Sequence, residues 1–418
     1  MPSATERVSV IRAAFPVDGL FANKNWGVTP EAFPLSTNHI EILEKLGPVL
    51  LKFTQACNLL YRQSVKGKQP SWIADLLDRG KSPELIAIER SDEIGQQIPL
   101  VIRPDLILTE NGFGLSELDS VPGGIGLTAW LNETYAGLGE LVLGGARGMH
   151  DGFASIFPTG DIVVAQEAAD YFSEFVYLAG KDRVFAAESY HPNGRPIYRF
   201  FECFDWSHLP TLHNWKPGQS MTPPLKPYLE EKLWLALFWL RPLQSFWRRE
   251  LGEKWQKFLQ QIIPYSWIVD PTPLPSHAVI PELGIQDFRE LGQFSQKERS
   301  LILKISGFSP DAWGARGVYM GSDLSTPEWT EKIIEALEAF PHHPYILQRF
   351  IKGGLFTHPY VDQDGAERQL EGRARVCPYY FIQNDRSTLG GVLVTHCPAD
   401  KKLLHGMKDA ILCPAKAG

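Results

Sequence analysis

Four charged side chains lie on two segments that read as neighbouring strands, at spacings suited to binding phosphate and a metal ion. Arg103 and Asp105 are two residues apart in the first segment, and Glu117 and Asp119 are two apart in the second. Because side chains of a strand point alternately to its two faces, each pair shares one face. Mg²⁺ prefers oxygen ligands such as carboxylates, and a guanidinium can bind phosphate through two hydrogen bonds. The pattern is typical of a site for a nucleotide with its Mg²⁺ ion.

The turn between the two segments decides whether the pairs meet. The segments 101–110 and 113–119 read as a hairpin around Glu110-Asn111-Gly112. A three-residue turn, with Gly112 left-handed in a bulge, pairs Thr109 with Phe113. Counting back then gives two opposed pairs on one face, Asp105 with Glu117 and Arg103 with Asp119. A two-residue Asn-Gly turn shifts the register by one residue and sends the pairs to opposite faces.

Two other interpretations of these residues remain open. The hairpin face could be a solvated surface in which arginine and aspartate pair across the strands, a common and weak interaction. Two of the carboxylates could instead be the acid and base of a glycosidase. Three converging carboxylates cannot all stay ionised without a cation, which favours the metal interpretation.

A second group of residues could bind phosphate further along the chain. Lys304 ends an apolar strand and precedes Gly307 and the glycine-bearing segment 314–317, so its ammonium group and nearby backbone N–H groups could face an anion. A third segment, 344–351, is an apolar strand with one polar pair, suited to presenting backbone groups to a planar base. A structural loop and a buried strand are the alternatives for these two segments.

Several common nucleotide and hydrolase motifs are absent from the sequence. The triplet Gly80-Lys81-Ser82 is not a Walker P-loop, because Asp75 stands where the first glycine should be. The patterns G-x-G-x-x-G, G-x-S-x-G and H-E-x-x-H do not occur. Simple dinucleotide-binding, serine-hydrolase and zincin interpretations are therefore excluded.

In order and spacing, these segments resemble the circularly permuted ATP-grasp family, and most closely the synthetase domain of glutathionylspermidine synthase. The family's Arg-x-Asp and Glu-x-Asn strands are similar to 103–105 and 117–119, with Asp119 in place of the neutral asparagine. Glu231-Lys232 and the apolar run after it look like the family's Asn-Lys helix. The family's C-terminal arginine has no obvious counterpart after Gly391, and Arg373 or Arg375 is expected to replace it.

The resemblance implies ATP and Mg²⁺ as cofactors and a role for each matching residue. The expected metal ligands are Asp105, Glu117 and Asp119, and the expected catalytic residues are Arg103 and Arg316. The expected substrate-binding residues are Ser120 and Lys232. The expected nucleotide-binding residues are Lys304, Gly314, Gly317, Leu347, Gln348 and Arg349.

The coarse pattern of the chain predicts an α/β (α+β) fold, circularly permuted and ATP-grasp-like, with helical insertions. Amphipathic periodicity predicts a helix over 37–60 and shorter ones at 71–79 and 83–90. Strand and helix patterns then alternate from 161 to 204, with a helix expected over 167–179. Helical patterns fill 228–263, where the spacing of Trp234, Trp239, Trp247 and Trp255 predicts core packing. We expect a helical region 1–98, the metal hairpin segment 99–152, a pre-ATP-grasp-like α/β region 153–275, and ATP-grasp lobes over 276–418.

Composition limits the partners. The 418 residues include 41 Lys and Arg against 48 Asp and Glu, a net charge of −7, so no overall field attracts nucleic acid. Five scattered cysteines without a C-x-x-C pair argue against a disulfide framework or a thiolate zinc site. No apolar run is long enough to span a bilayer, and we expect a cytoplasmic protein without membrane partners.

The resulting hypothesis is an ATP-dependent carboxylate–amine ligase that acts on small molecules. A substrate carboxylate would attack the γ-phosphate, and an amine would then displace phosphate from the acylphosphate. Two rivals remain: an ATP-grasp-like scaffold that binds nucleotide without transfer chemistry, and a kinase that phosphorylates a small molecule without joining an amine.

Overall fold

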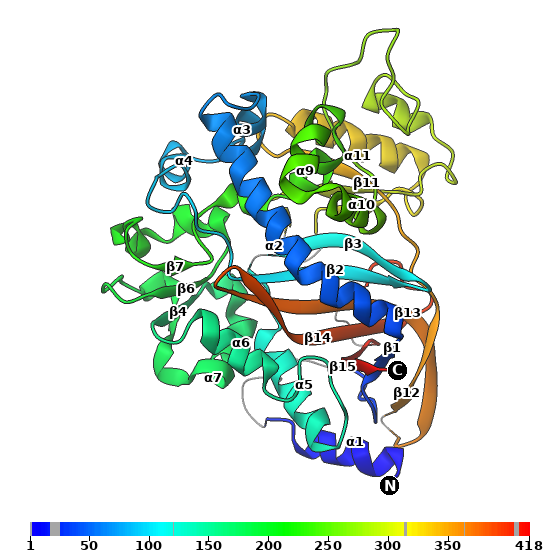
Figure 1. The fold of residues 1–418 in the computed structure, drawn as a ribbon. Helices are drawn as coiled ribbons and strands as arrows, with labels where there is room; N and C mark the ends of the chain where they lie inside the picture. Colours follow the sequence, from blue (N-terminus) through cyan, green and yellow to red (C-terminus); the bar gives the residue numbers. More distant parts are fainter. Residues whose placement is uncertain (1, 17–25, 120, 313–315, 363, 405–408) are drawn as a thin grey trace.

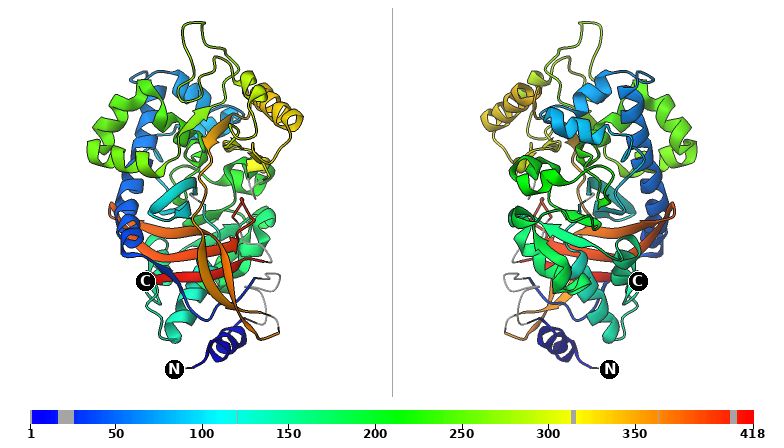
Figure 2. Two further views of the ribbon diagram at one scale, coloured as in Figure 1. Left: turned by 90° about the vertical axis from the view of Figure 1, so that its right-hand side faces the viewer. Right: turned by 90° about the vertical axis from the view of Figure 1, so that its left-hand side faces the viewer.

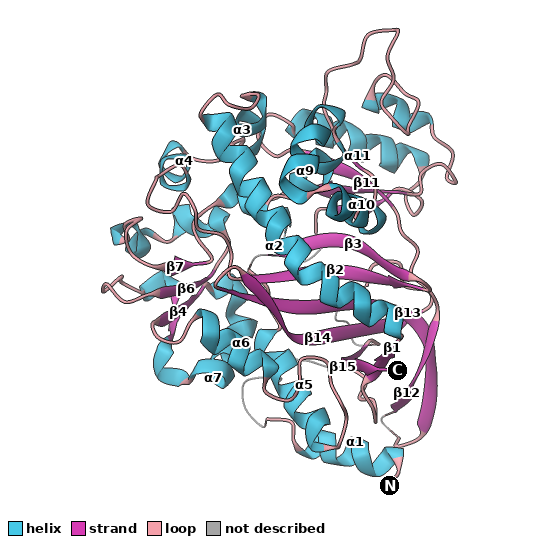
Figure 3. Ribbon diagram, in the orientation of Figure 1, coloured by secondary structure: helices cyan, strands magenta, loops and turns pink. Residues whose placement is uncertain are grey.

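The computed structural model of the chain describes residues 2–16, 26–119, 121–312, 316–362, 364–404 and 409–418. Three β-sheets, with helices packed on and between them, make up this part of the protein (Figures 1 and 3). Buried apolar side chains form three clusters, and strands of all three sheets contribute to the largest of them. The mixed α/β class predicted from the sequence is confirmed.

The central sheet has the strand order β1-β15-β14-β13-β2-β3, with β12 also paired to β13. All its pairs are antiparallel except β1 with β15. Its strands come from both ends of the chain, so the two ends close one sheet. The bounds are β1 Phe33–Leu35, β2 Val101–Thr109, β3 Gly112–Asp119, β12 Phe356–Val361, β13 Glu367–Gln383, β14 Arg386–Pro398 and β15 Ile411–Ala417.

Two smaller sheets flank the central one, and Figure 2 shows them from the sides. The first, in the order β10-β9-β11-β8, is antiparallel, and the second, in the order β5-β4-β6-β7, is parallel. The antiparallel one comprises β8 Ser266–Ile268, β9 Leu301–Ile305, β10 Val318–Met320 and β11 Tyr345–Arg349. The parallel one comprises β4 Asp161–Val164, β5 Val184–Ala186, β6 Ile197–Phe200 and β7 Met221–Thr222.

The longest helix, α2 (Thr37–Val65), lies across one face of the central sheet (Figure 1). It begins after Ser36, whose hydroxyl accepts a hydrogen bond from the backbone N–H of His39. Its apolar face, which includes Leu46, Leu50 and Phe53, is fully buried. The other helices are α1 Ala4–Ala13, α3 Trp72–Leu77, α4 Pro83–Glu89, α5 Ile125–Gly137, α6 Gly148–Ile156, α7 Phe172–Ala179, α8 Leu233–Trp239, α9 Gln244–Leu251, α10 Glu253–Ile262 and α11 Thr326–Ala339.

Most elements expected from periodicity are present, and two differ. The helix expected over 167–179 begins as a 3₁₀ segment, Gln166–Tyr171, because Ala168 has non-helical backbone angles, and only α7 is α-helical. The helical stretch expected over 228–263 is three short helices, since Pro242 and Gly252 interrupt it. Of the four tryptophans predicted to pack in the core, Trp234 and Trp247 are buried, and Trp239 and Trp255 are partly buried against it.

Within the described residues, no helix combines the length and the apolar character needed to cross a membrane. All five cysteines lie in the described part of the chain and are buried, and none forms a disulfide.

Candidate active site

The β2–β3 hairpin pairs the charged residues as the sequence predicted, but by a different route. Thr109 pairs with Gly112 across a two-residue turn, and Gly112 is not left-handed, so the expected glycine bulge is wrong. The register then shifts at Ser116, which is inserted between the pairs Leu106–Leu115 and Asp105–Glu117. One extra residue reverses the facing of everything after it. The bulge therefore restores the two opposed pairs, Asp105 with Glu117 and Arg103 with Asp119.

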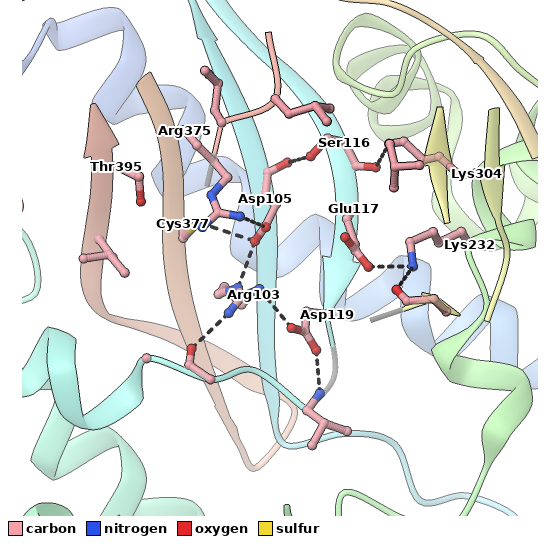
Figure 4. A pocket seen from close by; sticks show the side chains of 18 of the residues that line it. Arg103, Asp105, Ser116, Glu117, Asp119, Lys232, Lys304, Arg375, Cys377 and Thr395 are labelled. Atoms are coloured by element: carbon pink, nitrogen blue, oxygen red, sulfur yellow. Dashed lines mark hydrogen bonds and ion pairs between the residues drawn. The ribbon is translucent and has the colours of Figure 1, made fainter. Parts of the chain in front are cut away.

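Asp105 lies between two guanidinium groups. Arg103 Nε donates to its Oδ1 and Arg375 Nη1 donates to its Oδ2, both at 2.9 Å. The thiol of Cys377 lies 3.4 Å from the same Oδ1. Burial opposes ionisation of Asp105, but the two arginines outweigh it and lower its pKa below the usual value. Asp105 is thus a buried carboxylate that holds the two arginines in place (Figure 4).

Arg103 connects both strands of the hairpin with the segment that follows it. Its Nη2 lies 2.9 Å from an oxygen of Asp119, and its Nη1 donates to the carbonyl oxygen of Gly123, also at 2.9 Å. Together with the bond to Asp105, these contacts use three of the five N–H donors of the guanidinium. The remaining donors can bind an anion in the cavity that Arg103 lines.

Glu117 and Asp119 lie beside each other on the same strand face (Figure 4). Lys232 Nζ lies 2.7 Å from Glu117 Oε1, and this contact raises the pKa of Lys232 despite its burial. Burial, with Glu117 and Asp105 close by, raises the pKa of Asp119 although Arg103 opposes this. An added cation would therefore stabilise the ionised form of Asp119.

Lys304, on β9, reaches across to the hairpin from the antiparallel sheet. Its ammonium group donates to the carbonyl oxygen of Ser116 at 2.8 Å and to Oε1 of Gln348, on β11, at 2.9 Å. Burial lowers the pKa of Lys304 to about 8, and the like charge of Lys232 contributes to this shift. Gln348 is held in turn by Ser266, to which its Nε2 donates at 3.2 Å.

These side chains line one cavity of about 790 Å³, a size typical of small-molecule sites. One wall, formed by β2, β3, β9 and β13, carries Arg103, Lys232 from the start of α8, Lys304 and Arg375. A second part of the lining, the acidic wall, is acidic and aromatic and includes Tyr171 and residues at and after the end of β6. The acidic side chains here are Glu167, Glu174, Glu202 and Asp205, and the other aromatic ones include Phe200, Phe201 and Phe204.

Two carboxyl groups of the acidic wall are destabilised in their ionised form. Burial, reinforced by Glu230 and Asp119, raises the pKa of Glu202 well above its usual value. Burial also raises the pKa of Asp205 to about 6. A cationic ligand would offset both effects. The cavity therefore combines basic side chains with carboxyl groups whose ionised form a cationic ligand would stabilise.

The structure brings together some of the predicted site residues and separates others. Among the described residues, those that line the cavity are Arg103, Asp105, Glu117, Asp119, Lys232, Lys304, Gln348 and Arg349. Leu347 is fully buried in the core of the antiparallel sheet, and Gly317 is buried against Ile305. Arg316 is exposed and is not among the described lining residues. Ser120 and Gly314 lie outside the described residues. The chemical roles of all these residues stay predictions.

Residues on β13 complete the cavity, and only one of them was predicted from the sequence. Arg375, one of the two expected replacements for the family arginine, lines the cavity together with Cys377 and Tyr379. Arg373 instead donates to the carbonyl oxygen of Gly353 at 3.2 Å. The period-two alternation of 375, 377 and 379 was the available signal, since such residues share one strand face. The residues of the acidic wall carry no comparable pattern.

Glu117 and Asp119 are the carboxylates that fit a magnesium ion. Mg²⁺ is commonly held by one or two carboxylates together with substrate phosphates and water. The two side chains are 41% and 27% exposed, so both can accept a ligand from the cavity. Asp105 fits less well, because each of its oxygens is already paired with an arginine. In the described part of the chain, no three His, Cys, Asp or Glu side chains gather closely enough to hold a metal ion by themselves.

Comparison with known proteins supports the fold. No protein-family model and no curated protein matches the chain. The apo structure of a glutathione synthetase-like effector from Globodera pallida matches with a TM-score of 0.53 and 9% identity, covering 100% of this chain and 98% of the other. A putative gamma-glutamylcysteine synthetase from Methylobacillus flagellatus KT matches at a TM-score of 0.39 and 12% identity, over 84% of this chain and 85% of the other. The chain thus shares the overall fold of a glutathione synthetase-like protein, in line with an ATP-grasp-like architecture.

Proposed function

We propose that the protein is an ATP-dependent carboxylate–amine ligase. The observation that supports this most strongly is the convergence of Arg103, Lys232, Lys304 and Arg375 on one cavity that also contains Glu117 and Asp119. Fixed cations of this kind bind phosphate and carboxylate groups, and they stabilise the charge that develops during phosphoryl transfer. The glutathione synthetase-like fold is consistent with the same chemistry at a coarse level.

The reaction follows from what each wall can bind. A substrate carboxylate oxygen attacks the γ-phosphorus of ATP, and the bond to the ADP oxygen breaks. The amine nitrogen then attacks the acyl carbon, inorganic phosphate leaves, and the nitrogen loses a proton. Mg²⁺ held by Glu117 and Asp119 would neutralise phosphate charge. Lys304 and Arg103 hold the phosphate oxygens, and the carboxyl groups of Glu202 and Asp205 hold the amine.

A second candidate function is nucleotide binding without transfer. It is favoured by the pairing of Asp105 with two arginines and of Glu117 with Lys232, since these contacts occupy groups that would otherwise face ligands. For the ligase, ATP must therefore replace the contact between Glu117 and Lys232.

Product analysis separates the candidates. Purified protein is incubated with ATP, MgCl₂, and pools of amino acids, dipeptides and diamines, and ADP, phosphate and amides are measured by mass spectrometry. A ligase forms ADP and phosphate only when an acid and an amine are both present, in equal amounts with an amide. A phosphorylated product formed without an amine identifies a kinase. ATP binding without turnover in any pool identifies a scaffold and contradicts the ligase proposal.

A further inference from the structure

A fully buried ion pair lies next to the cavity and joins two distant parts of the chain. Lys81 Nζ lies 2.7 Å from Glu231 Oε1, and the two side chains are only 1% and 3% exposed. Lys81 lies between α3 and α4, in the triplet that fails the P-loop pattern, and Glu231 comes just before α8. Loss of one partner of such a pair leaves an uncompensated buried charge. The pair therefore constrains the positions of residues 81 and 231 relative to each other.

Glu231 also connects the ion pair to the end of β9. Its second oxygen, Oε2, accepts a hydrogen bond from the hydroxyl of Ser306. That hydroxyl accepts a bond from the N–H of Leu233 at 2.9 Å, and the carbonyl of Ser306 accepts one from the N–H of Lys232 at 3.0 Å. Ser306 thus ties the beginning of α8 to the end of β9.

The two backbone segments joined in this way carry the two lysines of the cavity. Lys232 is the residue after Glu231, and Lys304 lies two residues before Ser306. Their side chains reach neighbouring residues of one strand, Lys232 to Glu117 and Lys304 to the carbonyl of Ser116. The contacts among Lys81, Glu231 and Ser306 therefore hold together the two backbone segments from which these ammonium groups extend.

The loop that carries Lys81 also contacts the segment that connects α11 to β11. Arg79 donates to the carbonyl oxygen of Phe340 at 3.0 Å, just after α11. Gly80 has a positive φ of +72°, and a Cβ there would lie 2.3 Å from the carbonyl oxygen of His342. Only glycine permits this close approach. Residues 79–81 therefore contact both the α11–β11 connection and the start of α8.

We propose that Lys81 is a positioning residue of the cavity: through Glu231 and Ser306 it fixes the spacing of Lys232 and Lys304, and thereby the affinity for a polyphosphate. Lys81 is not among the described residues that line the cavity, so it acts through Glu231. The inference rests on the proposed function only for the identity of the ligand. The positioning itself is a property of the unliganded protein.

The first test measures ATP binding in the presence of MgCl₂ by calorimetry for wild type, Lys81→Met, and Lys81→Met/Glu231→Gln. The double variant removes both charges, so its thermal stability is expected to recover toward wild type. ATP affinity is expected to fall by roughly 10–100-fold in both variants, as is common when a residue that orients a ligand-binding group is lost. Recovery of affinity together with stability would show that Lys81 is only structural, and would overturn the inference.

A matched control comes from a distant ion pair. Arg7 Nη2 and Glu140 Oε1 form a partly buried pair between α1 and the segment after α5, and neither residue lines the cavity. Arg7→Met is expected to lower the melting temperature and leave ATP affinity unchanged. A similar loss of ATP affinity in Arg7→Met would show that the fall in affinity of the Lys81 variants comes from general destabilisation.

The second test does not depend on ATP. Native protein is treated briefly with acetic anhydride, and acetylation of each lysine is followed by mass spectrometry. In wild type, Lys232 is expected to react slowly because it is buried and paired with Glu117. In the double variant its rate is expected to rise several-fold, while exposed Lys68 is unchanged. Unchanged acetylation of both Lys232 and Lys304 would overturn the positioning role. Failure of wild type to bind ATP would instead contradict the proposed function.

Discussion

The ammonium group of Lys304 donates a hydrogen bond to the backbone carbonyl of Ser116 at 2.8 Å, although 188 residues separate the two in the chain. Ser116 is also the bulge residue that sets the register of the β2–β3 hairpin. The bulge residue therefore directly precedes Glu117 and provides a carbonyl oxygen for the lysine of the opposite sheet. The bulge links the two halves of the candidate site.

Deletion of Ser116 is expected to weaken ATP binding. It removes the bulge but leaves Asp105 opposite Glu117 and Arg103 opposite Asp119, because Glu117 then follows Leu115 directly in a regular ladder. The deletion removes the carbonyl oxygen that accepts the hydrogen bond from Lys304. Ser116→Ala is the matched control, because it keeps the bulge and the carbonyl and loses only the hydroxyl bond to the carbonyl of Asp105. We expect a cost of about 1 kcal/mol in urea unfolding and normal ATP affinity for this variant. Loss of ATP binding in Ser116→Ala would contradict this role of the backbone.

ATP affinity is expected to fall as the pH rises above the pKa of Lys304, about 8. Burial favours the neutral amine in the unliganded protein, whereas a bound phosphate requires the ammonium form. Affinity should therefore decrease by up to about tenfold per pH unit above this value, since protonation must accompany binding. Calorimetry between pH 7 and 9.5 measures this dependence. Lys304→Arg is expected to remove the decline, because arginine stays protonated, and an identical decline in that variant would assign it to another group.

Folding stability is expected to fall in mild acid because of His358. This buried side chain contacts the hydroxyl of Thr29 at 2.9 Å and the carbonyl of Glu31 at 3.3 Å. Burial, with the nearby His396, lowers its pKa from 6.5 to about 4. The unfolded chain thus binds a proton more readily between these values, and stability that is complete above pH 6.5 is lost as the pH falls to 4.

The free energy of unfolding is expected to decrease by about 3 kcal/mol between pH 6.5 and 4 because of His358. Urea unfolding of wild type and His358→Gln at several pH values measures it. The difference in free energy of unfolding between the two proteins should narrow as the pH falls. A constant difference would mean that His358 does not titrate in this range.

Local patterns predicted much of the hairpin and of the helices, because they depend on neighbours in sequence. The opposed pairs of Arg103 with Asp119 and of Asp105 with Glu117 were predicted, yet from the wrong turn, since the position of a bulge has no strong sequence signature. The local sequence also did not show where the helix changes type, since the helix predicted over 167–179 begins as a 3₁₀ segment.

The contacts that complete the site join residues far apart in the chain, and periodicity does not detect them. Arg375 and Asp105 are 270 residues apart, and Lys81 and Glu231 are 150 apart. The long β13–β14 hairpin was not predicted, although its tight turn uses Asn384 and Asp385 at positive φ, residue types that tolerate this conformation. Its pairing with β2 closes the central sheet beside the cavity.

The central claim is tested most directly by calorimetric titration of ATP, with MgCl₂ or with a chelator, into wild type and Glu117→Gln. The ligase account predicts that Mg²⁺ tightens ATP binding to wild type by at least tenfold and that Glu117→Gln loses this gain. The variant should still bind ATP with chelator, because Lys232 is released from its contact with Glu117. Absence of ATP binding by wild type, or an equal Mg²⁺ gain in both proteins, would contradict the account.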